Sequence, residues 1–401
     1  MKLEAQKIID RVVGGTMLVV LKPFVVALGF VLRRDHELKP GRDITVLKML
    51  GGGSLVIALP ALLGLRKKYP DARLRLVTTG GIVPFAETLG VFDEIVAIEQ
   101  GSLFSLAWSG ARALARAFRS DTFLDLEVYS KLTTVFSVLT CSRNRLGFYL
   151  ESVVWRRPIH THLIFFNRSA PVHLFYERMT GLLGAQLASH EDCRALVLEQ
   201  VRDRAPALVR EPGQRRIALG TGCSLLSRER MFTAEEWLEV FRRRVKADRT
   251  LLEAQFLFLG GKEDAPLAER ILSLLRIEWP GIRIVNLCGR LKLRESIAAV
   301  AAAGEFWGID SSLLHYARLF GLYTVSYWGP TSPEALLKPY GLKEEVHYRK
   351  IPCSPCVHVA EFPPCAGRNV CMTSHLREFT DDEIRARLPV ISNLPLPSEL
   401  A

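Results

Sequence analysis

From residue 43 onward, short apolar runs alternate with amphipathic stretches. DITVLKML at 43–50 is rich in β-branched and aliphatic residues and predicts a buried strand, followed by a glycine-rich turn at 51–54 and a helix over about 56–68. A second strand at ARLRLVTT, a helix near Val83–Leu89 and a third strand at DEIVAIE come next. Strand, turn, helix and strand at this spacing predict βαβ units and a parallel sheet.

The same pattern restarts after residue 213. RRIALGTGCS predicts a strand and a turn, and TAEEWLEVFRRRV predicts a helix with Thr233 as N-cap and Glu236 completing a capping box. Ligands of open parallel sheets bind at the carboxyl ends of the strands. We therefore predict an α/β protein with two Rossmann-like, doubly wound domains, joined near residues 190–213, whose strand ends face a central cleft. The expected divisions are an N-terminal segment at 1–42, domains at 43–195 and 196–345, a Cys-rich loop at 346–376, and a C-terminal helix and tail at 377–401.

Residues 12–32 form an apolar stretch long enough to cross a bilayer. Lys22 and Pro23 interrupt it, since a Lys at the bilayer centre costs roughly 2.5–3.5 kcal/mol and a Pro breaks or kinks a helix. This predicts a helical hairpin that lies at a membrane interface or packs on the protein, with a true span as the third alternative. The flanking basic residues suit anionic headgroups: Arg11, Lys22, Arg33 and Arg34.

The charge balance narrows the class of partner. Lys and Arg number 53 against 42 Asp and Glu, which gives a formal net charge of +11, and such a protein usually meets an acidic partner. Zinc-finger spacing, RNP-type aromatic strands and long basic runs are missing, so nucleic acid is not expected. An anionic membrane or a phosphorylated substrate remains, and the alternative is a basic surface that contacts only solvent. The sequence shows no cleavable signal peptide, so a cytoplasmic location is expected.

Two strand-to-helix turns are candidates for binding a phosphate group. The first, with Gly52, Gly53 and Ser54, lets a ligand come close to the backbone, although a tight turn alone would also explain it. The second is GIDSSLLHYA at 308–317, where a strand ends at Asp310 and a helix begins with free N–H groups. The alternative there is that Asp310 caps the helix and His315 is structural.

A cysteine cluster follows in a loop rich in Pro and Gly, with the spacing Cys353-x2-Cys356-x8-Cys365-x5-Cys371. This resembles a tetrahedral zinc site. Free thiols or disulfides are the alternative to a structural zinc.

The sequence resembles glycosyltransferase family 9, the lipopolysaccharide heptosyltransferases, in three regions taken together. These regions are KMLGGGSLVIALPALLGLRKKYPDARLRLV, GIDSSLLHYARLFGLYTVSYWGPTSPE and the cysteine cluster. The resemblance runs from about residue 43 to 376. It implies a GT-B fold, with the donor bound by the C-terminal lobe and the acceptor by the N-terminal lobe. It also implies transfer with inversion, without a cofactor, from a nucleotide-diphosphate sugar, with an ADP-sugar favoured, to a lipid-linked or polysaccharide acceptor at the cytoplasmic face of the inner membrane.

The family motifs carry over unevenly. Asp310 and His315 match the family's Asp-Gly-Pro-x-His stretch, while its Gly and Pro are absent. The resulting donor and phosphate site consists of Thr221, Gly222, Arg230, Ser311, Ser312, Leu313 and His315. The family's proposed catalytic Asp in the first turn is Ser54 here, and a Ser without a partner is no base near neutral pH.

A replacement base must be a carboxylate or a His. Glu127, near the end of the strand TFLDLEVYSK, is the first candidate and Asp310 the second. By strand alternation Asp125 and Glu127 would face the same side. The alternative is that Glu127 pairs with Lys131 or Arg143. The missing Asp also keeps open a catalytically silent nucleotide-sugar-binding or scaffold protein of envelope polysaccharide assembly. An epimerase of the same fold is a third alternative.

Overall fold

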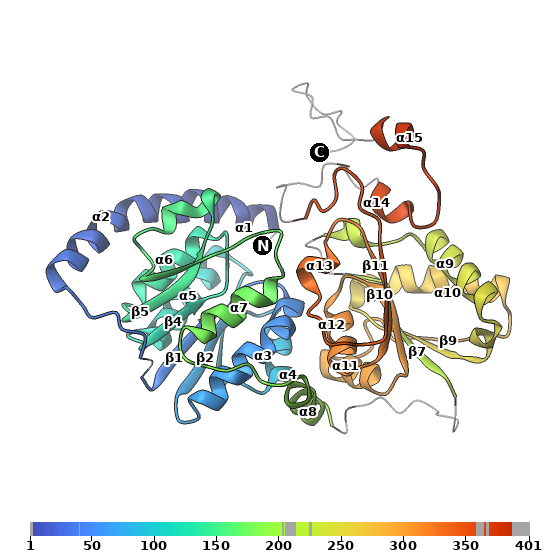
Figure 1. Ribbon diagram of the computed structural model, residues 1–401, viewed down its shortest axis with the longest axis horizontal. Helices are drawn as coiled ribbons and strands as arrows, with labels where there is room; N and C mark the ends of the chain where they lie inside the picture. Colours follow the sequence, from blue (N-terminus) through green and yellow to red (C-terminus); the bar gives the residue numbers. More distant parts are fainter. Residues whose placement is uncertain are drawn as a thin grey trace. The chain divides into compact units, whose positions relative to one another are not determined.

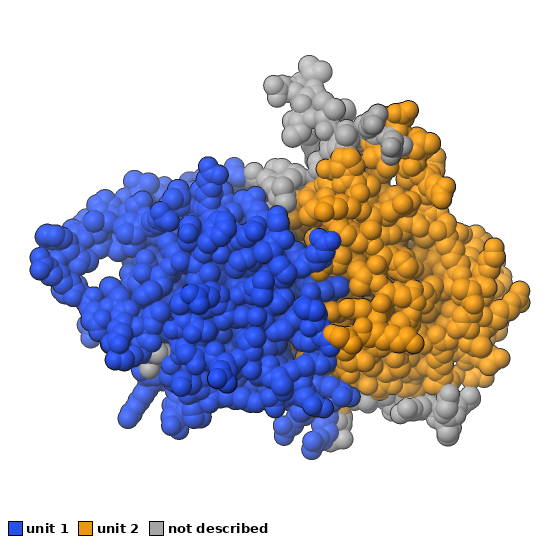
Figure 2. Space-filling model, viewed as in Figure 1, with its two compact units in different colours: residues 1–203, 334–340 blue, residues 204–333, 341–401 orange. Residues whose placement is uncertain are grey.

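The computed structural model describes residues 3–39, 41–202, 204, 214–223, 227–357, 365 and 369–386. The chain divides into two compact units, which are coloured separately in Figure 2. Unit 1 comprises residues 1–203 and 334–340, and unit 2 comprises residues 204–333 and 341–401. Each unit holds a six-stranded sheet with helices around it, so the predicted α/β class is confirmed.

Unit 1 contains a parallel sheet in the order β3-β2-β1-β4-β5-β6. Its strands are β1 (Asp43–Leu47), β2 (Arg73–Thr79), β3 (Glu94–Ile98), β4 (Thr122–Asp125), β5 (Asn144–Tyr149) and β6 (His162–Phe165). Its helices are α1 (Leu3–Ile9), η1 (Asp10–Gly14), α2 (Gly15–Leu32), α3 (Gly52–Lys68), α4 (Val83–Leu89), α5 (Leu103–Ala117), α6 (Lys131–Leu139), η2 (Glu151–Arg156), α7 (Val172–Gly181) and α8 (His190–Gln200). The strand order turns around between β1 and β4, as in a doubly wound sheet.

Unit 2 repeats this arrangement in the order β12-β11-β10-β7-β8-β9, again all parallel. Its strands are β7 (Arg216–Gly220), β8 (Gln255–Phe258), β9 (Arg283–Asn286), β10 (Glu305–Ile309), β11 (Tyr323–Trp328) and β12 (Glu344–Tyr348). Its helical segments are η3 (Arg228–Arg230), α9 (Ala234–Ala247), η4 (Arg249–Glu253), η5 (Lys262–Asp264), α10 (Ala265–Glu278), α11 (Leu293–Ala301), α12 (Ser312–Leu319), α14 (Val370–Thr373) and α15 (Asp381–Ala386). α13 (Pro333–Leu336) stands where the chain returns to unit 1. The rest of the predicted C-terminal tail, 387–401, lies outside the described residues.

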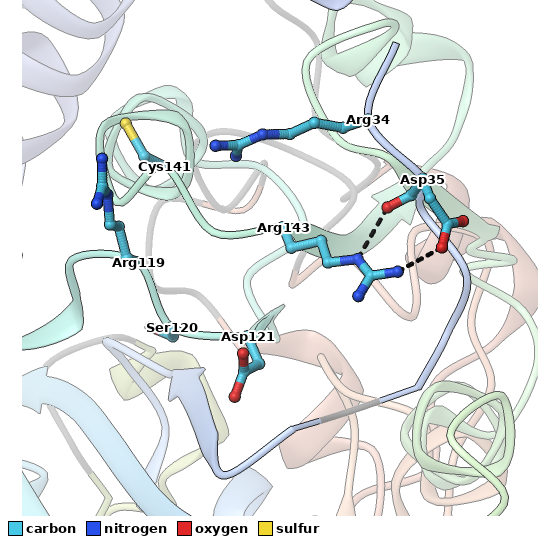
Figure 3. A pocket seen from close by; sticks show the side chains of 7 residues that line it. All are labelled: Arg34, Asp35, Arg119, Ser120, Asp121, Cys141 and Arg143. Atoms are coloured by element: carbon cyan, nitrogen blue, oxygen red, sulfur yellow. Dashed lines mark hydrogen bonds and ion pairs between the residues drawn. The ribbon is translucent and has the colours of Figure 1, made fainter. Parts of the chain in front are cut away.

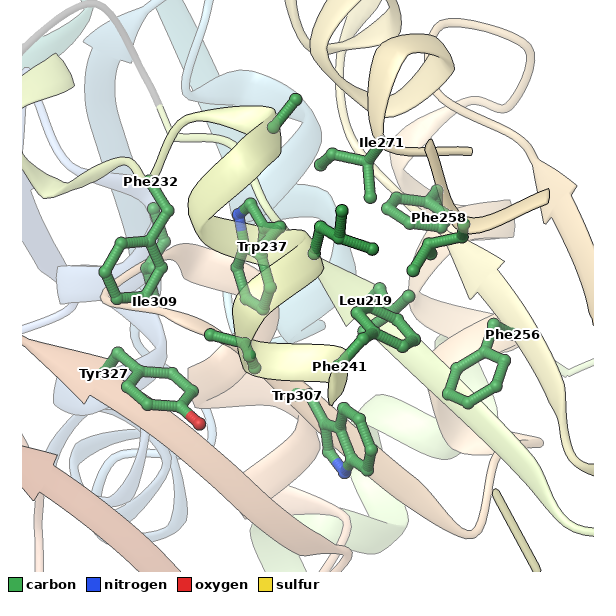
Figure 4. Packing of buried hydrophobic residues seen from close by; sticks show 14 of the residues in the cluster. Leu219, Phe232, Trp237, Phe241, Phe256, Phe258, Ile271, Trp307, Ile309 and Tyr327 are labelled. Carbon is green, nitrogen blue, oxygen red and sulfur yellow. The ribbon is translucent and has the colours of Figure 1, made fainter. Parts of the chain in front are cut away.

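Aromatic side chains fill the core of unit 2 between α9 and the sheet (Figure 4). Trp237 and Phe241 of α9 are fully buried, and the ring of Phe241 lies 5.1 Å from Phe256 and 5.8 Å from Trp307. The helix begins where the sequence predicts, because Thr233 and Glu236 form the expected capping box. This packing fixes β7, β8 and β10 and thereby the loops at their carboxyl ends.

The two units divide between residues 203 and 204, inside the predicted junction at 190–213, although the predicted domain boundary at 195–196 falls within α8. α8 continues through residues 195–196 and packs against α3 and α4. Residues 334–340 also belong to unit 1, where Lys338 pairs with Glu177 at 2.5 Å and Tyr340 stacks on His190. A helix buries its apolar face against whatever lies beside it in space, and a linear composition change does not reveal that neighbour.

The predicted hairpin in the N-terminal segment is wrong, because α2 continues through Pro23 as one helix (Figure 1). A proline removes one hydrogen bond but supplies no reversal of direction, and no turn residues accompany it. Only a narrow seam is packed: Leu18 is buried against Val135 and Ile159. The combined helix from Ala5 to Leu32 has the length and composition of a membrane span, and only 6% of its most apolar window is buried.

Candidate functional site

In unit 2 the strand order turns around between β7 and β10, and Asp310 follows β10 directly. Its carboxylate is buried and accepts a hydrogen bond from Arg230 at 3.1 Å, while His315 Nε2 lies 3.8 Å away. Arg230 also donates to the backbone oxygens of Asp310 and Ser227. Although burial acts to raise the pKa of Asp310, the Arg230 guanidinium outweighs it and holds that pKa well below its usual range. Asp310 is therefore charged at neutral pH, and Arg230 neutralises it.

The start of α12 is open beside this ion pair. Ser311 is the N-cap, but no side chain caps the helix, so Asp310 does not serve as its cap. Two buried hydroxyls near the carboxyl ends of β7 and β10 make no hydrogen bond within the described part of the chain: Thr221 and Ser311. Buried polar groups are nearly always paired, so these hydroxyls and the free N–H groups point to a polar ligand. A diphosphate suits a helix N-terminus by hydrogen bonding and by charge.

The donor residues predicted from the sequence thus fall into two groups. Thr221, Ser311 and the first residues of α12, Ser312 and Leu313, lie at this strand edge. Gly222 lies there too, and a side chain on it would collide with Asp264. Arg230 and His315, in contrast, are turned toward Asp310.

In unit 1 the corresponding turnaround lies between β1 and β4, where Glu127 follows β4 by two residues. One carboxylate oxygen, Oε1, accepts three hydrogen bonds: from Lys48 Nζ at 2.7 Å and from the N–H groups of Met49 and Leu50 at 2.8 and 3.1 Å. Neither of the partners expected for an ion pair, Lys131 or Arg143, is the one observed. The other oxygen, Oε2, makes no hydrogen bond to any described residue.

Lys48 is almost completely buried beneath Glu127. Burial acts to lower the pKa of Lys48, but Glu127 and Tyr176 outweigh it, so that the pKa is raised and Lys48 stays charged. Glu127 thereby fixes the β1–α3 connection through one oxygen while its side chain stays 16% exposed. Lys48 is the one basic residue in the otherwise largely apolar run DITVLKML, and our sequence prediction missed this signal.

Asp125 lies next to Glu127, whose backbone N–H donates to the Asp125 carboxylate at 3.0 Å, but the two carboxylates have different main partners. β4 ends at Asp125, whose buried carboxylate lies 3.3 Å from Arg156 and 3.4 Å from His160. Burial acts to raise the pKa of Asp125, and Arg156 and His160 outweigh it and lower that pKa. Glu127 lies beyond the strand, where alternation no longer holds, and it points toward β1 instead.

The glycine-rich segment after β1 is the first turn of α3 and not a separate loop. The helix begins at Gly52, with Gly51 as an N-cap at a φ of 81° that favours glycine. A side chain at Gly52 would overlap the Phe85 ring. Ser54 lies beside the Tyr176 hydroxyl, and burial raises the pKa of that tyrosine. This helix N-terminus has no side-chain cap either, so it can accept an anionic group.

The four clustered cysteines are free thiols. Burial raises the pKa of Cys356 to about 11 and of Cys371 to about 12, and the neighbouring thiols raise both further. Within the described residues no group of three or more His, Cys, Asp or Glu side chains is arranged to hold a metal ion. The zinc site stays a prediction, and no step of the chemistry below depends on it.

Comparisons with known proteins agree with this architecture. Residues 200–365 match the sequence model of glycosyltransferase family 9 (heptosyltransferase), so the resemblance to that family is confirmed. No curated protein sequence matches the chain.

The chain is also similar to solved structures at low identity. A family 9 glycosyltransferase from Veillonella parvula is 18% identical with a TM-score of 0.59, covering 77% of this chain and 86% of its own. The ADP-heptose lipopolysaccharide heptosyltransferase II of E. coli is 17% identical, with a TM-score of 0.56 and coverage of 77% and 91%. The E. coli heptosyltransferase WaaC, solved with ADP-2-deoxy-2-fluoro heptose, is 12% identical, with a TM-score of 0.58 and coverage of 77% and 93%. These likenesses establish the GT-B fold.

The donor site generates the first prediction. Arg230→Ala should weaken ADP binding tenfold or more in calorimetry, because a charge-assisted hydrogen bond is worth about 1.5–3 kcal/mol. The same change leaves the Asp310 charge buried and unpaired, which typically costs about 3–5 kcal/mol of stability. Comparing Asp310→Asn with the double variant Asp310→Asn/Arg230→Ala separates the two effects. If these two variants bind ADP equally well, Arg230 only neutralises Asp310.

The cysteine cluster generates the second prediction. If the cluster holds zinc, the purified protein should contain about one equivalent of metal by elemental analysis, since a structural site takes one ion. Cys356→Ser should remove that metal, whereas Cys193→Ser, at a buried cysteine in unit 1, should leave it in place. A metal-free wild-type protein that is stably folded would dismiss the zinc site.

Proposed function

We propose that the protein is a glycosyltransferase that moves a sugar, such as heptose, from a nucleotide-diphosphate sugar to a lipopolysaccharide or other envelope glycan acceptor, with inversion. The open N-terminus of α12 beside the two unpartnered buried hydroxyls of Thr221 and Ser311 carries this proposal. This region lies at the turnaround of the unit 2 sheet, within the residues that match the family. An ADP-sugar is the favoured donor, because WaaC structures hold ADP and an ADP-heptose analogue.

Glu127 is the proposed general base on the acceptor side. Inversion requires that an acceptor hydroxyl attack the anomeric carbon while a base takes its proton and the nucleoside diphosphate leaves with the bonding electrons. The hydrogen bonds to Oε1 hold the carboxylate in one orientation, and Oε2 remains available to accept the proton. The α12 N-terminus would stabilise the negative charge that develops on the departing diphosphate.

The alternative is a catalytically silent protein that binds nucleotide sugars or organises envelope polysaccharide assembly. Two observations favour it: Ser54 stands where the family has its Asp, and Glu127 is tied to Lys48 and the backbone. A transfer assay with a panel of nucleotide-diphosphate sugars separates the two functions. Binding of ADP without turnover of any donor would support the silent protein.

The third prediction tests the base. Glu127→Gln keeps an oxygen for the N–H groups of Met49 and Leu50 but loses basicity, so turnover should fall a hundredfold or more, within the range of about 10²–10⁴ for a lost general base. Donor affinity should stay unchanged. Ser54→Ala is the matched control and should retain activity.

If Glu127→Gln turns over normally, Glu127 is structural. A gain of activity in Ser54→Asp would show that the natural protein has weakened the family's chemistry.

We further propose that α2 attaches unit 1 to the cytoplasmic face of an anionic membrane without crossing it. Asp10, just before α2, accepts hydrogen bonds from the N–H groups of Lys131 and Leu132 at the start of α6. Asp35, just after α2, pairs with Arg143 at 2.6 Å. Both flanks are thus fixed to one unit, whereas a span would place them on opposite sides of a core about 30 Å thick. A helix that lies in the plane of the membrane interface keeps both flanks on the same side and still places its apolar surface in lipid.

The fourth prediction tests this attachment. Phe24, Phe30 and Val31 are exposed apolar residues of α2, and replacing all three with Gln should release the protein from anionic vesicles in a sedimentation assay. Replacing Phe165, Leu174 and Ile277, which are also exposed, should not. Both variants should unfold near the wild-type temperature, because neither set belongs to the core. Wild-type protein that resists extraction by high salt and alkaline carbonate would show deep insertion instead.

A further inference from the structure

A cavity of about 590 Å³ lies in unit 1 at the amino ends of the strands, the opposite edge from Glu127. Its lining comes from three separate segments (Figure 3). Arg119 and Asp121 precede β4, Cys141 and Arg143 precede β5, and Arg34 and Asp35 follow α2. The volume is typical of a small-molecule site, for which about 300–1,000 Å³ is usual.

The carboxylates around the cavity are already engaged. Asp35 accepts from Arg143 at 2.6 Å, and Asp121 accepts from the backbone N–H of Asp43 at 3.0 Å. Arg34 makes no hydrogen bond or ion pair to any described residue, and Arg119 only lies over the Phe118 ring.

A further cation, Arg145, lies near Arg34 without lining the cavity. Arg145 donates only to the backbone oxygens of Ser142 and Ile159. Burial lowers the pKa of Arg145, while Cys141 acts to raise that pKa and nearby Arg34 acts to lower it. Guanidinium groups with this geometry bind phosphate oxygens well, and an anion in the cavity would offset their repulsion.

The cavity opens where the apolar helix ends. Every residue of α2 from Val26 to Leu32 is exposed, and Phe30 and Val31 are each 74% exposed. Arg34 follows Leu32 by two residues. A molecule that contacts both the exposed apolar end of α2 and the arginines of the cavity needs an apolar chain and a phosphate group.

We propose that the cavity bounded by Arg34, Arg119 and Arg143 binds the phosphate of an anionic phospholipid headgroup. This site rests on the proposed membrane contact of α2 and gives that contact a fixed lipid ligand. It is separate from the strand edge that carries Glu127, so lipid binding there leaves the acceptor side of unit 1 open.

The test uses the full chain and short-chain dihexanoyl-phosphatidylglycerol, kept below its micelle concentration so that no membrane is present. Wild-type protein should bind this lipid in calorimetry, and Arg34→Gln should weaken binding tenfold or more, as expected for a lost charge-assisted hydrogen bond. Arg33→Gln is the matched control. Its guanidinium lies over Phe30 outside the cavity, and its loss should change affinity less than twofold. Arg119→Gln should resemble Arg34→Gln.

Vesicles and free phosphate complete the design. On phosphatidylglycerol vesicles Arg34→Gln should lose more affinity than Arg33→Gln. If Arg34→Gln and Arg33→Gln lose equal affinity, both on vesicles and for the soluble lipid, the site is overturned. Equal losses would mean that the arginines attract lipid only through their general positive charge. Inorganic phosphate that binds as tightly as the short-chain lipid would overturn the lipid assignment. If wild-type protein binds the soluble lipid but no vesicle, the membrane contact of α2 fails while the cavity assignment stands.

Discussion

Both units depend on one topological constraint: all strands are parallel, and the order turns around at a central pair. At that point the connections leaving the two central strands go to opposite faces, so their carboxyl ends are not covered by a crossing helix. In unit 1 this pair is β1 and β4, and in unit 2 it is β7 and β10. Asp310 comes directly after β10 and Glu127 two residues after β4, and the open starts of α12 and α3 stand beside them.

The charges at the two turnarounds are balanced within each unit. Lys48 neutralises Glu127, and Arg230 neutralises Asp310, so neither carboxylate needs a ligand to be stable. The groups without a hydrogen-bond partner are hydroxyls and helix N–H groups in unit 2 and, in unit 1, the Glu127 carboxylate oxygen Oε2. Such a site is suited to receive a diphosphate without losing its structure when empty. Ser54, which replaces the family's Asp, lies in the first turn of α3. The replacement is therefore compatible with the fold.

The N-terminal helix α2 is held to unit 1 in a different way from the helices that cover the sheet. It is attached by polar contacts at its ends and by a narrow apolar seam, and most of its apolar surface is left uncovered. A helix that is apolar on all sides is ordinarily buried in protein or lipid. Because both flanks are bonded to unit 1, the uncovered part is available to a membrane surface on one side only. In the proposed attachment, the basic cavity at the end of this helix would face the headgroups of that surface.

The sequence by itself determined most of the secondary structure: the two α/β halves, the capping box at Thr233, the strand end at Asp310 and the family resemblance. These follow from hydrophobic period and local motifs, which act over a few residues. It did not determine what Glu127 touches, because Lys48 is 79 residues away and meets it only when β1 and β4 pair. Nor did it determine that α2 continues through Pro23, or that residues near 34, 119 and 143 line one open pocket. Pairing between distant segments is set by the packing of the whole sheet, and only the tertiary structure contains that information.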